Sequence, residues 1–389
     1  MRELATGLAT GANRFEAFAP AHVQNLTAYD PGFEPSEVKR QLGLAEMVEL
    51  GSNENSYGPA AAVKAFLAAP YGPQSDAQPH RYPDAGGRIL KRAIAEQLSE
   101  SYQQSFATDQ ITLGNGTHEL LTLIAETFCL SGEIVLHAQY GFAVYSLAAK
   151  GAGAIAKAVP VAADFSISPE ALLAAVTPNT KLIYLANPNN PTGSYWSHAE
   201  LVRFLNALPA HVLFVLDEAY AEFADAADFP LGPALLAAHP QLIVARTFSK
   251  AYGLANLRVG YTISHADFAQ LLERTRLSFN VNGIALRAAA LAIADQAHIK
   301  YVREQNAQQR QRLAAALAGR GLQVLPSQGN FLLIDFAVET LPIAAALLQL
   351  GVVVRPMKPY GLPQYLRFTV GTAAENAKLL AALDQVRGQ

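Results

Sequence analysis

Residues 247–260 have the sequence T-F-S-K-A-Y-G-L-A-N-L-R-V-G, and this stretch decides the predicted fold. It follows L-I-V-A at residues 242–245, a short apolar run that is typical of a buried β-strand. We therefore expect Lys250 in the loop at the C-terminal end of a strand, which is where ligands bind in an open α/β sheet. A lysine at such a position can form a Schiff base with a carbonyl compound.

Three hydrogen-bond donors lie close to Lys250 in the sequence. Thr247 and Ser249 precede it, and Arg258 follows. Hydroxyl and guanidinium groups bind phosphate oxygens, and a guanidinium can do so with two parallel hydrogen bonds. A phosphate or another anion is therefore the ligand that this loop is expected to bind. An isolated lysine after a strand is more simply a surface residue, so the assignment depends on partners elsewhere in the chain.

A second candidate anion site follows the predicted strand at residues 110–113. The next residues, 114–119, are G-N-G-T-H-E, and a helix is expected over residues 120–130. Backbone N–H groups at the start of a helix lack helical partners, and the helix dipole places partial positive charge there. A glycine turn that leads into a helix with a hydroxyl residue is therefore suited to a phosphate, although many helices begin in this way without a ligand.

Two further predicted strands end in polar motifs. The run at residues 181–186 leads into N-P-N-N-P-T-G at 187–193. The run at residues 212–216 ends at D-E-A-Y, residues 217–220. A carboxylate at the end of a buried strand is costly unless it meets a cation or hydrogen-bond donors, so Asp217 is expected to have such a partner. Because a helical segment joins each strand to the next, we expect a mostly parallel sheet covered by helices.

The chain divides into three expected parts. Residues 1–50 should form an arm, residues 51–282 the large domain, and residues 283–389 a smaller α+β domain that packs with the arm. The last part begins with a long helical region that ends near Gly321. Its expected strands and final helix cover residues 330–335, 351–355, 365–370 and 375 onwards.

Composition excludes several classes of protein. The chain has 389 residues, of which 29 are basic and 32 acidic, and its formal net charge of -3 gives no support to a nucleic-acid partner. A single cysteine excludes an internal disulfide and indicates a reducing, cytoplasmic location. Charged residues near the N-terminus argue against a signal peptide, and no apolar run reaches the roughly 18 residues of a membrane-spanning helix. No side-chain grouping has the spacing of a metal site or a hydrolytic triad.

The sequence G-A-G-A-I-A at residues 151–156 matches the letters of a dinucleotide-binding fingerprint. A true fingerprint follows a strand and opens a helix, whereas these residues are expected to follow a helix and enter a strand. We interpret the glycines as the end of a helix, so no dinucleotide is expected.

Together, the motifs at residues 187–193, 217–220 and 247–260 resemble those of the fold-type-I aminotransferases, which use pyridoxal 5'-phosphate (PLP). The resemblance implies an α/β fold with two domains. The large domain would contain a mostly parallel, helix-covered sheet of the seven-stranded type, and the smaller domain would be α+β. It also implies a PLP-dependent transaminase in which Lys250 forms the Schiff base and then moves a proton between substrate and cofactor. A cofactor-free α/β protein is the alternative.

The resemblance implies that residues at several strand ends bind the cofactor. Asp217 would face the pyridine nitrogen and keep it protonated. Tyr220 and Asn190 would hydrogen-bond the 3'-oxygen of the ring, and Tyr140 would stack on its face. The phosphate would lie among Gly116, Thr117, His118, Thr247, Ser249 and Arg258. His118 stands where the family usually has an acid or an amide, and we expect it to point away from the cofactor.

Within that group the chain most resembles the histidinol-phosphate aminotransferases, from about Tyr29 to the C-terminus. The matching segments include Y-D-P-G at 29, S-N-E-N-S-Y-G at 52, R-Y-P-D at 81 and R-P-M-K-P-Y-G-L-P-Q-Y-L-R at 355. The resemblance implies a homodimer with shared active sites, in which Tyr57 reaches the cofactor phosphate of the neighbouring subunit. The substrate side would be lined by Tyr29, Asn55, Arg355 and Arg367. Two prolines that the family usually has, before Tyr29 and at Ser56, are missing, so a looser arm is expected.

This resemblance implies transamination of L-histidinol phosphate with 2-oxoglutarate in histidine biosynthesis. The partners would be a small-molecule amino donor and a 2-oxo acid, with no nucleic acid and no membrane. A related aminotransferase for aromatic or other amino acids, in a specialised pathway, stays an alternative because substrate loops diverge more readily than cofactor loops. A PLP-binding regulatory module would need a DNA-binding domain, and residues 1–50 contain no helix-turn-helix pattern and no basic cluster.

Overall fold

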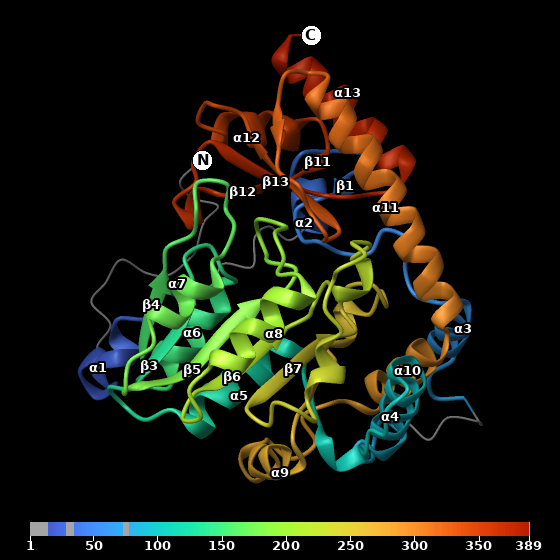
Figure 1. Cartoon of the computed structure of the whole chain (residues 1–389). Coiled ribbons are helices and arrows are strands. Elements are labelled where there is room, and N and C mark those ends of the chain that lie inside the picture. Colours follow the sequence, from blue (N-terminus) through green and yellow to red (C-terminus); the bar gives the residue numbers. More distant parts are fainter. Residues whose placement is uncertain (1–14, 29–34, 73–77, 389) are drawn as a thin grey trace.

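A seven-stranded sheet forms the centre of the large domain in the computed structural model, which describes residues 15–28, 35–72 and 78–388 (Figure 1). Its strand order is β2-β8-β7-β6-β5-β3-β4. The strands are β2 (Ile111–Gly114), β3 (Ile134–Ala138), β4 (Ile155–Val159), β5 (Thr180–Ala186), β6 (Leu213–Asp217), β7 (Leu242–Thr247) and β8 (Gly260–Ile263). Strands β3 to β7 are parallel and β8 is antiparallel to its neighbours, which confirms the mostly parallel sheet.

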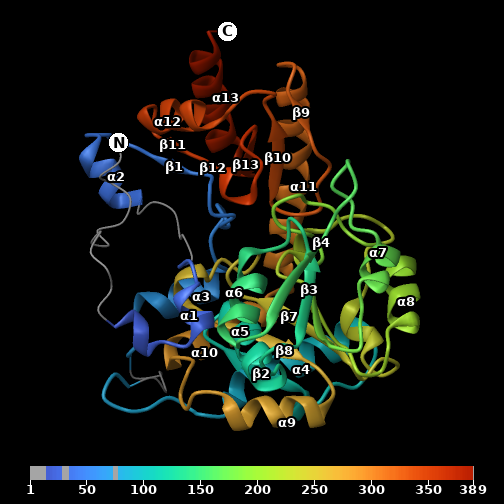
Figure 2. The same cartoon turned by 90° about the vertical axis from the view of Figure 1, so that its left-hand side faces the viewer.

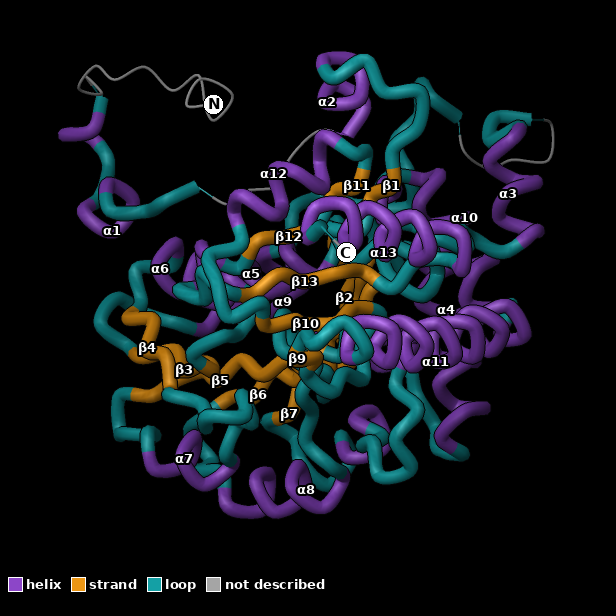
Figure 3. Tube along the Cα trace, turned by 90° about the horizontal axis from the view of Figure 1, so that it is seen from above, coloured by secondary structure: helices purple, strands orange, loops and turns teal. Residues whose placement is uncertain are grey.

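Helices cover both faces of this sheet. From the start of the described residues to Ala294, the α-helices are α1 (Ala21–Gln24), α2 (Pro35–Gln41), α3 (Ala61–Ala68), α4 (Arg88–Tyr102), α5 (Thr117–Phe128), α6 (Ala143–Gly151), α7 (Pro169–Ala174), α8 (His198–Ala207), α9 (Ala266–Thr275) and α10 (Gly283–Ala294). Of these, α2 lies beside the smaller domain (Figure 2), α1 packs against α6, and α3 packs against α10. Figure 3 shows α7 and α8 along one face and α5 and α6 along the other. The glycines at 151 and 153 end α6 before β4, as predicted. In the described part of the chain, no helix has both the length and the apolar character that crossing a membrane requires.

Alternating side chains decide which face of the sheet each strand residue covers. Leu182 and Tyr184 of β5 belong to the core next to α5 and α6, whereas Ile183 and Leu185 belong to the core on the α8 face. The alternation continues to the strand ends. Asp217, the last residue of β6, therefore lies on the α6 face, where its side chain contacts that helix.

The connection between β7 and β8 departs from the expectation that a helix joins each strand to the next. Residues 248–259 instead form the loop of an antiparallel pair, in which Thr247 lies opposite Gly260. The backbone N–H of Phe248 also donates to the carbonyl of Val259, at 3.1 Å. Strand β8 has only four residues, which are too few to show a strand pattern in the sequence.

The smaller domain contains a four-stranded sheet, β12-β13-β10-β9, and a parallel pair of β1 with β11. Its strands are β1 (Val48–Glu49), β9 (Gln323–Val324), β10 (Phe331–Asp335), β11 (Val352–Val353), β12 (Arg355–Pro356) and β13 (Tyr365–Thr369). Its helices are α11 (Gln296–Ala318), α12 (Leu341–Gln349) and α13 (Ala373–Arg387). The arm contacts both domains, because β1 pairs with β11 whereas α1 packs against α6 (Figure 2).

The hydrophobic core divides inside α11, and the predicted domain boundary at residue 283 stays a prediction. Helix α10 packs against α4, and Ala285 and Ala289 belong to the core of the large domain. Leu313 and Leu317, near the end of α11, belong to the core of the smaller domain. Helix α11 runs along one side of the molecule from one domain to the other (Figure 1), and its 23 residues span about 35 Å. One continuous helix therefore contributes to both cores.

A buried ion pair links β6 and β7 on the face opposite Asp217. Arg246 donates through Nε and Nη2 to Oε2 of Glu218, at 2.9 and 2.7 Å, and through Nη2 to the hydroxyl of Tyr102, at 2.6 Å. The Glu218 side chain is fully buried. Burial raises the pKa of Glu218, although the Arg246 charge opposes that shift. The second acid of D-E-A-Y is therefore a structural residue.

Replacing the cation of this pair should destabilise the fold. Arg246→Met leaves Glu218 buried without its cation, and we expect the free energy of unfolding to fall by about 3–5 kcal/mol. The control is Arg88→Met, which removes an ion pair between Arg88 and Asp84 on the surface and should leave the free energy nearly unchanged. Urea titration followed by circular dichroism measures both. Equal losses in the two variants would contradict a structural role for the buried pair.

Candidate active site

Three parallel strands end at the same edge of the large sheet. The register of β5 and β6 sets Ala186 opposite Asp217, and the register of β6 and β7 sets Asp217 opposite Ala245. The N-P-N-N-P-T-G, D-E-A-Y and lysine segments therefore start side by side. Because ligands of open α/β sheets bind at this edge, the polar motifs meet where the sequence predicts a site.

The pairing of β7 with β8 assembles the predicted anion site. It returns Arg258 to Ser249, so that the arginine Nη1 lies 3.3 Å from the serine Oγ, while Thr247 Oγ1 accepts the Ser249 N–H at 3.1 Å. Gly116 has a φ of 86° and directly precedes α5 at Thr117. That φ is one that residues with a side chain rarely adopt, and a Cβ at Gly116 would also displace the end of the Arg258 side chain, so glycine is favoured there. The start of α5 and the lysine loop thus form one cradle of donors.

His118 lies in the first turn of α5 and is half-buried. Burial lowers the pKa of His118, and the Arg258 charge lowers it further. The imidazole is therefore expected to be neutral at pH 7. That it points away from the cofactor stays a prediction.

Lys250 is partly buried, and its amine is directed into the site. Its Nζ donates to the carbonyl of Ser52 at 3.0 Å and lies 5.7 Å from the centre of the Tyr220 ring. Burial lowers the pKa of Lys250 to about 8, and the Arg367 charge acts in the same direction. A much larger fraction of this amine is neutral at pH 7 than in an exposed lysine. The neutral amine is the form that reacts with carbonyl groups and accepts protons.

Asp217 is only 3% exposed and has two hydrogen-bond donors. Its Oδ1 accepts the N–H of Ala219 at 3.1 Å, and its Oδ2 accepts the hydroxyl of Tyr145 at 2.8 Å. Burial raises the pKa of Asp217 to about 6, although both hydrogen bonds oppose that shift. The group is therefore a carboxylate at neutral pH, able to pair with a cationic ring nitrogen.

Tyr220, Asn190 and Arg367 form a chain of hydrogen bonds between the two domains. The Tyr220 hydroxyl accepts from Nδ2 of Asn190 at 3.3 Å and from Nδ2 of Asn53 at 3.1 Å. Arg367, on β13, donates to Oδ1 of Asn190 and to the carbonyl of Gly51, both at 2.6 Å. The structure thus brings together residues that the sequence assigns separately to cofactor and substrate.

Arg355 and Arg367 are direct neighbours in the smaller sheet. They lie opposite one another in the antiparallel pair of β12 and β13. Opposite residues of such a pair project from the same face, so both guanidinium groups lie on one side of the sheet. Arg367 is buried and Arg355 is partly buried.

Two more predicted residues come from the turn before α3. Asn55 donates through Nδ2 to the carbonyl of Ala251, next to the lysine, at 2.8 Å. Tyr57 packs edge-on against Tyr301, with ring centres 5.8 Å apart. Tyr29 lies outside the described residues. The assigned roles of these residues stay predictions.

Tyr140 precedes α6 and belongs to a contact between the domains. Its backbone carbonyl accepts Nδ2 of Asn189 at 3.1 Å. Its ring packs against Phe165, and Phe165 packs against Tyr365 of β13, with ring centres 5.4 Å apart in both pairs. The backbone contact ties Tyr140 to the N-P-N-N-P-T-G segment.

Sequence reasoning missed Ser52, Asn53 and Tyr145. The first two belong to the S-N-E-N-S-Y-G segment, whose composition already indicates a turn, and Asn53 has a φ of 55° that asparagine tolerates well. Tyr145 carries no local signal, because its contact with Asp217 joins residues 72 positions apart. Only the folded structure shows this pair.

The donors and the acid of this site suit PLP. The cradle fits a phosphate, the buried carboxylate fits a pyridinium nitrogen, and the lysine amine fits an aldehyde. Within residues 15–28, 35–72 and 78–388, no group of three His, Cys, Asp or Glu side chains is arranged to hold a metal ion. The cradle, the carboxylate and the lysine amine together support the chemistry of an aldehyde cofactor with a phosphate.

Known proteins match the chain along most of its length. The family described as "Aminotransferase class I and II" matches residues 45–383. Histidinol-phosphate aminotransferase 2 of Pseudomonas fluorescens (strain Pf0-1) is 42% identical over 377 residues, which cover 96% of this chain and 99% of that protein. The protein of the same name from Pasteurella multocida (strain Pm70) is 42% identical over 367 residues, which cover 94% and 97%.

A solved structure is also similar. The histidinol-phosphate aminotransferase from Sinorhizobium meliloti in complex with PLP has a TM-score of 0.82 and 34% sequence identity, and the match covers 94% of this chain and 96% of that one. The fold, the geometry of the site and the similarity to these proteins agree. The chain therefore belongs to the class I and II aminotransferases, which are PLP-dependent transaminases.

Proposed function

We propose that this aminotransferase transfers the amino group of L-histidinol phosphate to 2-oxoglutarate in histidine biosynthesis, as a cytoplasmic homodimer with shared active sites. The relatives named histidinol-phosphate aminotransferase, which are similar to this chain over almost its whole length, support the proposal. The observation that carries it is the pair Arg355 and Arg367 on one face of the smaller sheet.

The side chains of the site have distinct roles in this reaction. Bound PLP supplies an aldehyde that condenses with amines and a ring that accepts electrons from the substrate's Cα. Asp217 keeps the ring nitrogen protonated, because its carboxylate is ionised at neutral pH. Lys250 accepts and returns the Cα proton as a neutral amine. The cradle at Gly116 and Arg258 binds the phosphate and fixes the orientation of the ring.

Two guanidinium groups suit a pocket that must accept two different anions. Histidinol phosphate carries a phosphate and no carboxylate, whereas glutamate, the product of the other half-reaction, carries two carboxylates. A guanidinium binds either oxyanion with two parallel hydrogen bonds, which a lysine cannot do. Arg367 is already held by Asn190 and the Gly51 carbonyl, so its direction is fixed before substrate binds.

An aminotransferase for aromatic amino acids is the second candidate. The contact of Tyr140, Phe165 and Tyr365 favours it, because these rings lie between the two domains beside the N-P-N-N-P-T-G segment. Aromatic side chains could pack on such rings.

Single-turnover measurements of each half-reaction distinguish the two candidates. We expect the parent protein to react faster with histidinol phosphate than with phenylalanine, and to complete the cycle with 2-oxoglutarate. Loss of the cofactor's absorbance on addition of each donor gives the rate. A preference for phenylalanine would replace the proposed substrate and leave the cofactor assignments unchanged.

The two arginines should differ in their effects. Arg367→Ala should slow both half-reactions, because Arg367 lies in the hydrogen-bond chain with Asn190. Arg355→Ala should weaken the binding of histidinol phosphate more than that of glutamate, by roughly 1.5 to 3 kcal/mol if one charge-assisted hydrogen bond is lost. Arg312→Ala, at an exposed position of α11, is the control for loss of a positive charge. Equal effects of Arg355→Ala and Arg312→Ala would remove Arg355 from the substrate site.

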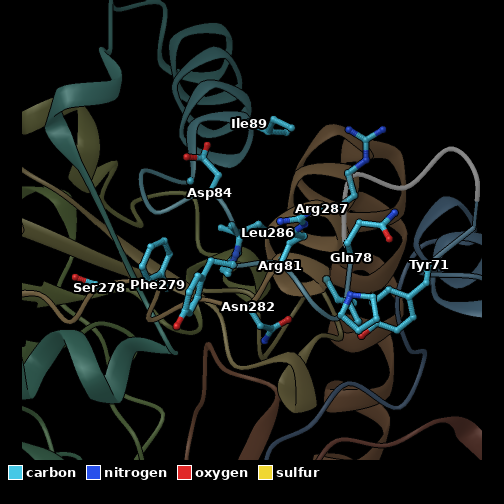
Figure 4. Close-up of a pocket in the computed structure, with 16 residues that line it drawn as sticks. Tyr71, Gln78, Arg81, Asp84, Ile89, Ser278, Phe279, Asn282, Leu286 and Arg287 are labelled. Carbon is cyan, nitrogen blue, oxygen red and sulfur yellow. The ribbon is translucent and has the colours of Figure 1, made fainter.

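An aromatic surface on the large domain supports the homodimer. A hollow of about 740 Å³ lies between the R-Y-P-D segment at residues 81–84 and the start of α10 (Figure 4). At this hollow Tyr82 is 82% exposed and stacks on Phe279, with ring centres 4.6 Å apart. Arg81 and Arg287 line the same hollow. Exposed aromatic rings beside arginines are typical of protein interfaces, and a second copy of this chain is the proposed occupant.

Mixing inactive variants tests whether the active sites are shared. If Tyr57 completes the site of its partner, mixing Lys250→Ala with Tyr57→Ala restores up to about a quarter of the parent activity, because half of the dimers are hybrids with one intact site. The control mixes Lys250→Ala with Asp217→Asn, two residues of the same subunit's site, and should restore nothing. Subunit exchange is checked by native mass spectrometry. Hybrids without restored activity would contradict the shared site.

A further inference from the structure

Tyr145 lies on α6 and is 1% exposed. Its hydroxyl donates to Oδ2 of Asp217 at 2.8 Å. Asp217 ends a strand on the face of the sheet that α6 covers, so the phenol and the carboxylate meet inside the core. The bond therefore joins the interior of the large domain to the acid of the active site.

The direction of the Tyr145 hydroxyl is fixed by its neighbours. The ring stacks on Tyr184, with centres 5.1 Å apart and planes inclined by 10°, and Phe142 packs edge-on against it at 5.9 Å. Tyr184 is itself anchored, because its hydroxyl donates to the carbonyl of Leu121 at 2.6 Å. Two parallel phenols thus carry out different tasks in one cluster, since one reaches a backbone carbonyl and the other reaches Asp217.

A neutral phenol beside a carboxylate can only donate its proton in a hydrogen bond. Burial raises the pKa of Tyr145 well above 10, so the phenol stays protonated throughout the working range of pH. A hydrogen bond to the charged form of an acid stabilises that form and lowers its pKa. Burial has the opposite effect on Asp217 and raises its pKa to about 6.

Few other groups near Asp217 affect its pKa. On its own strand end, the Glu218 charge raises the pKa of Asp217, although that side chain points to the opposite face and pairs with Arg246. Tyr220 lies within electrostatic reach and is neutral, since its pKa is raised to about 12 by burial. The strand residues directly opposite are Ala186 on β5 and Ala245 on β7, which carry no charge.

We propose that Tyr145 is a positioning residue that keeps Asp217 ionised and holds its carboxylate in one orientation toward the pyridine nitrogen of PLP. Without the phenol, Asp217 would take up a proton at higher pH. A neutral carboxyl can no longer form an ion pair with the pyridinium, so the protein would lose PLP at a pH where the parent retains it.

Equilibrium dialysis of PLP against pH tests this role without measuring activity. In the parent, affinity should fall as pH drops through the pKa of Asp217. In Tyr145→Phe this fall should move to higher pH by about one to two units, because the lost bond is to a charged group. Tyr184→Phe is the matched control. It removes a hydroxyl from the stacked neighbour, and its PLP affinity should fall at the same pH as that of the parent. If PLP affinity fell at the same pH in Tyr145→Phe and Tyr184→Phe, the proposal would be overturned.

A second measurement decides the question if Tyr145→Phe folds poorly. Site-specific replacement of Tyr145 by 3-fluorotyrosine keeps the shape of the ring and makes the hydroxyl a stronger donor. The fall in PLP affinity should then move to lower pH, opposite to the shift in Tyr145→Phe. Circular dichroism and thermal unfolding check that the fold is kept. An unchanged or higher position of the fall with 3-fluorotyrosine would contradict a role of the hydrogen bond in keeping Asp217 ionised.

Discussion

The candidate active site depends on the backbone pairing of β8 with its two neighbours. Strand β8 lies between β7 and β2, and Gly260 is opposite both Thr247 and Gly114. One residue therefore joins the lysine loop to the turn before α5. The loop returns on itself, Arg258 reaches Ser249, and the donors for a phosphate come from segments that are more than a hundred residues apart in the sequence. Without this pairing, the lysine and the anion cradle would not be held in fixed positions relative to one another.

The two adjacent acids of D-E-A-Y show how strand alternation separates chemistry from stability. Asp217 points to the α6 face, where Tyr145 and the Ala219 N–H bind its carboxylate. Glu218 points to the other face and is neutralised by Arg246. Burying a charge is costly unless it is paired or hydrogen-bonded. Hydrogen bonds stabilise the Asp217 carboxylate, and an ion pair stabilises that of Glu218. The acid with uncharged donors is left available for a cationic ring.

Apolar runs were enough to predict the strands that end in the site, and the roles expected of Lys250, Asp217 and Asn190 came from the resemblance of their motifs to those of fold-type-I aminotransferases. Such patterns are local, so they predict the secondary structure of a segment and the residue at which a polar loop begins. They could not show β8, which has four residues, or the division of the core within α11, a continuous helix. Contacts between distant segments, such as Tyr145 with Asp217 and Asn53 with Tyr220, follow from the packing of the folded chain alone.

We propose that these strand ends form one PLP site with Lys250 at its centre. Borohydride reduction fixes PLP covalently to the lysine that binds it, and peptide mapping by mass spectrometry then identifies that lysine. We expect the added mass to lie on the peptide containing Lys250 and to be absent from Lys250→Ala. Stoichiometric labelling of a different lysine, with Lys250 unmodified, would contradict it.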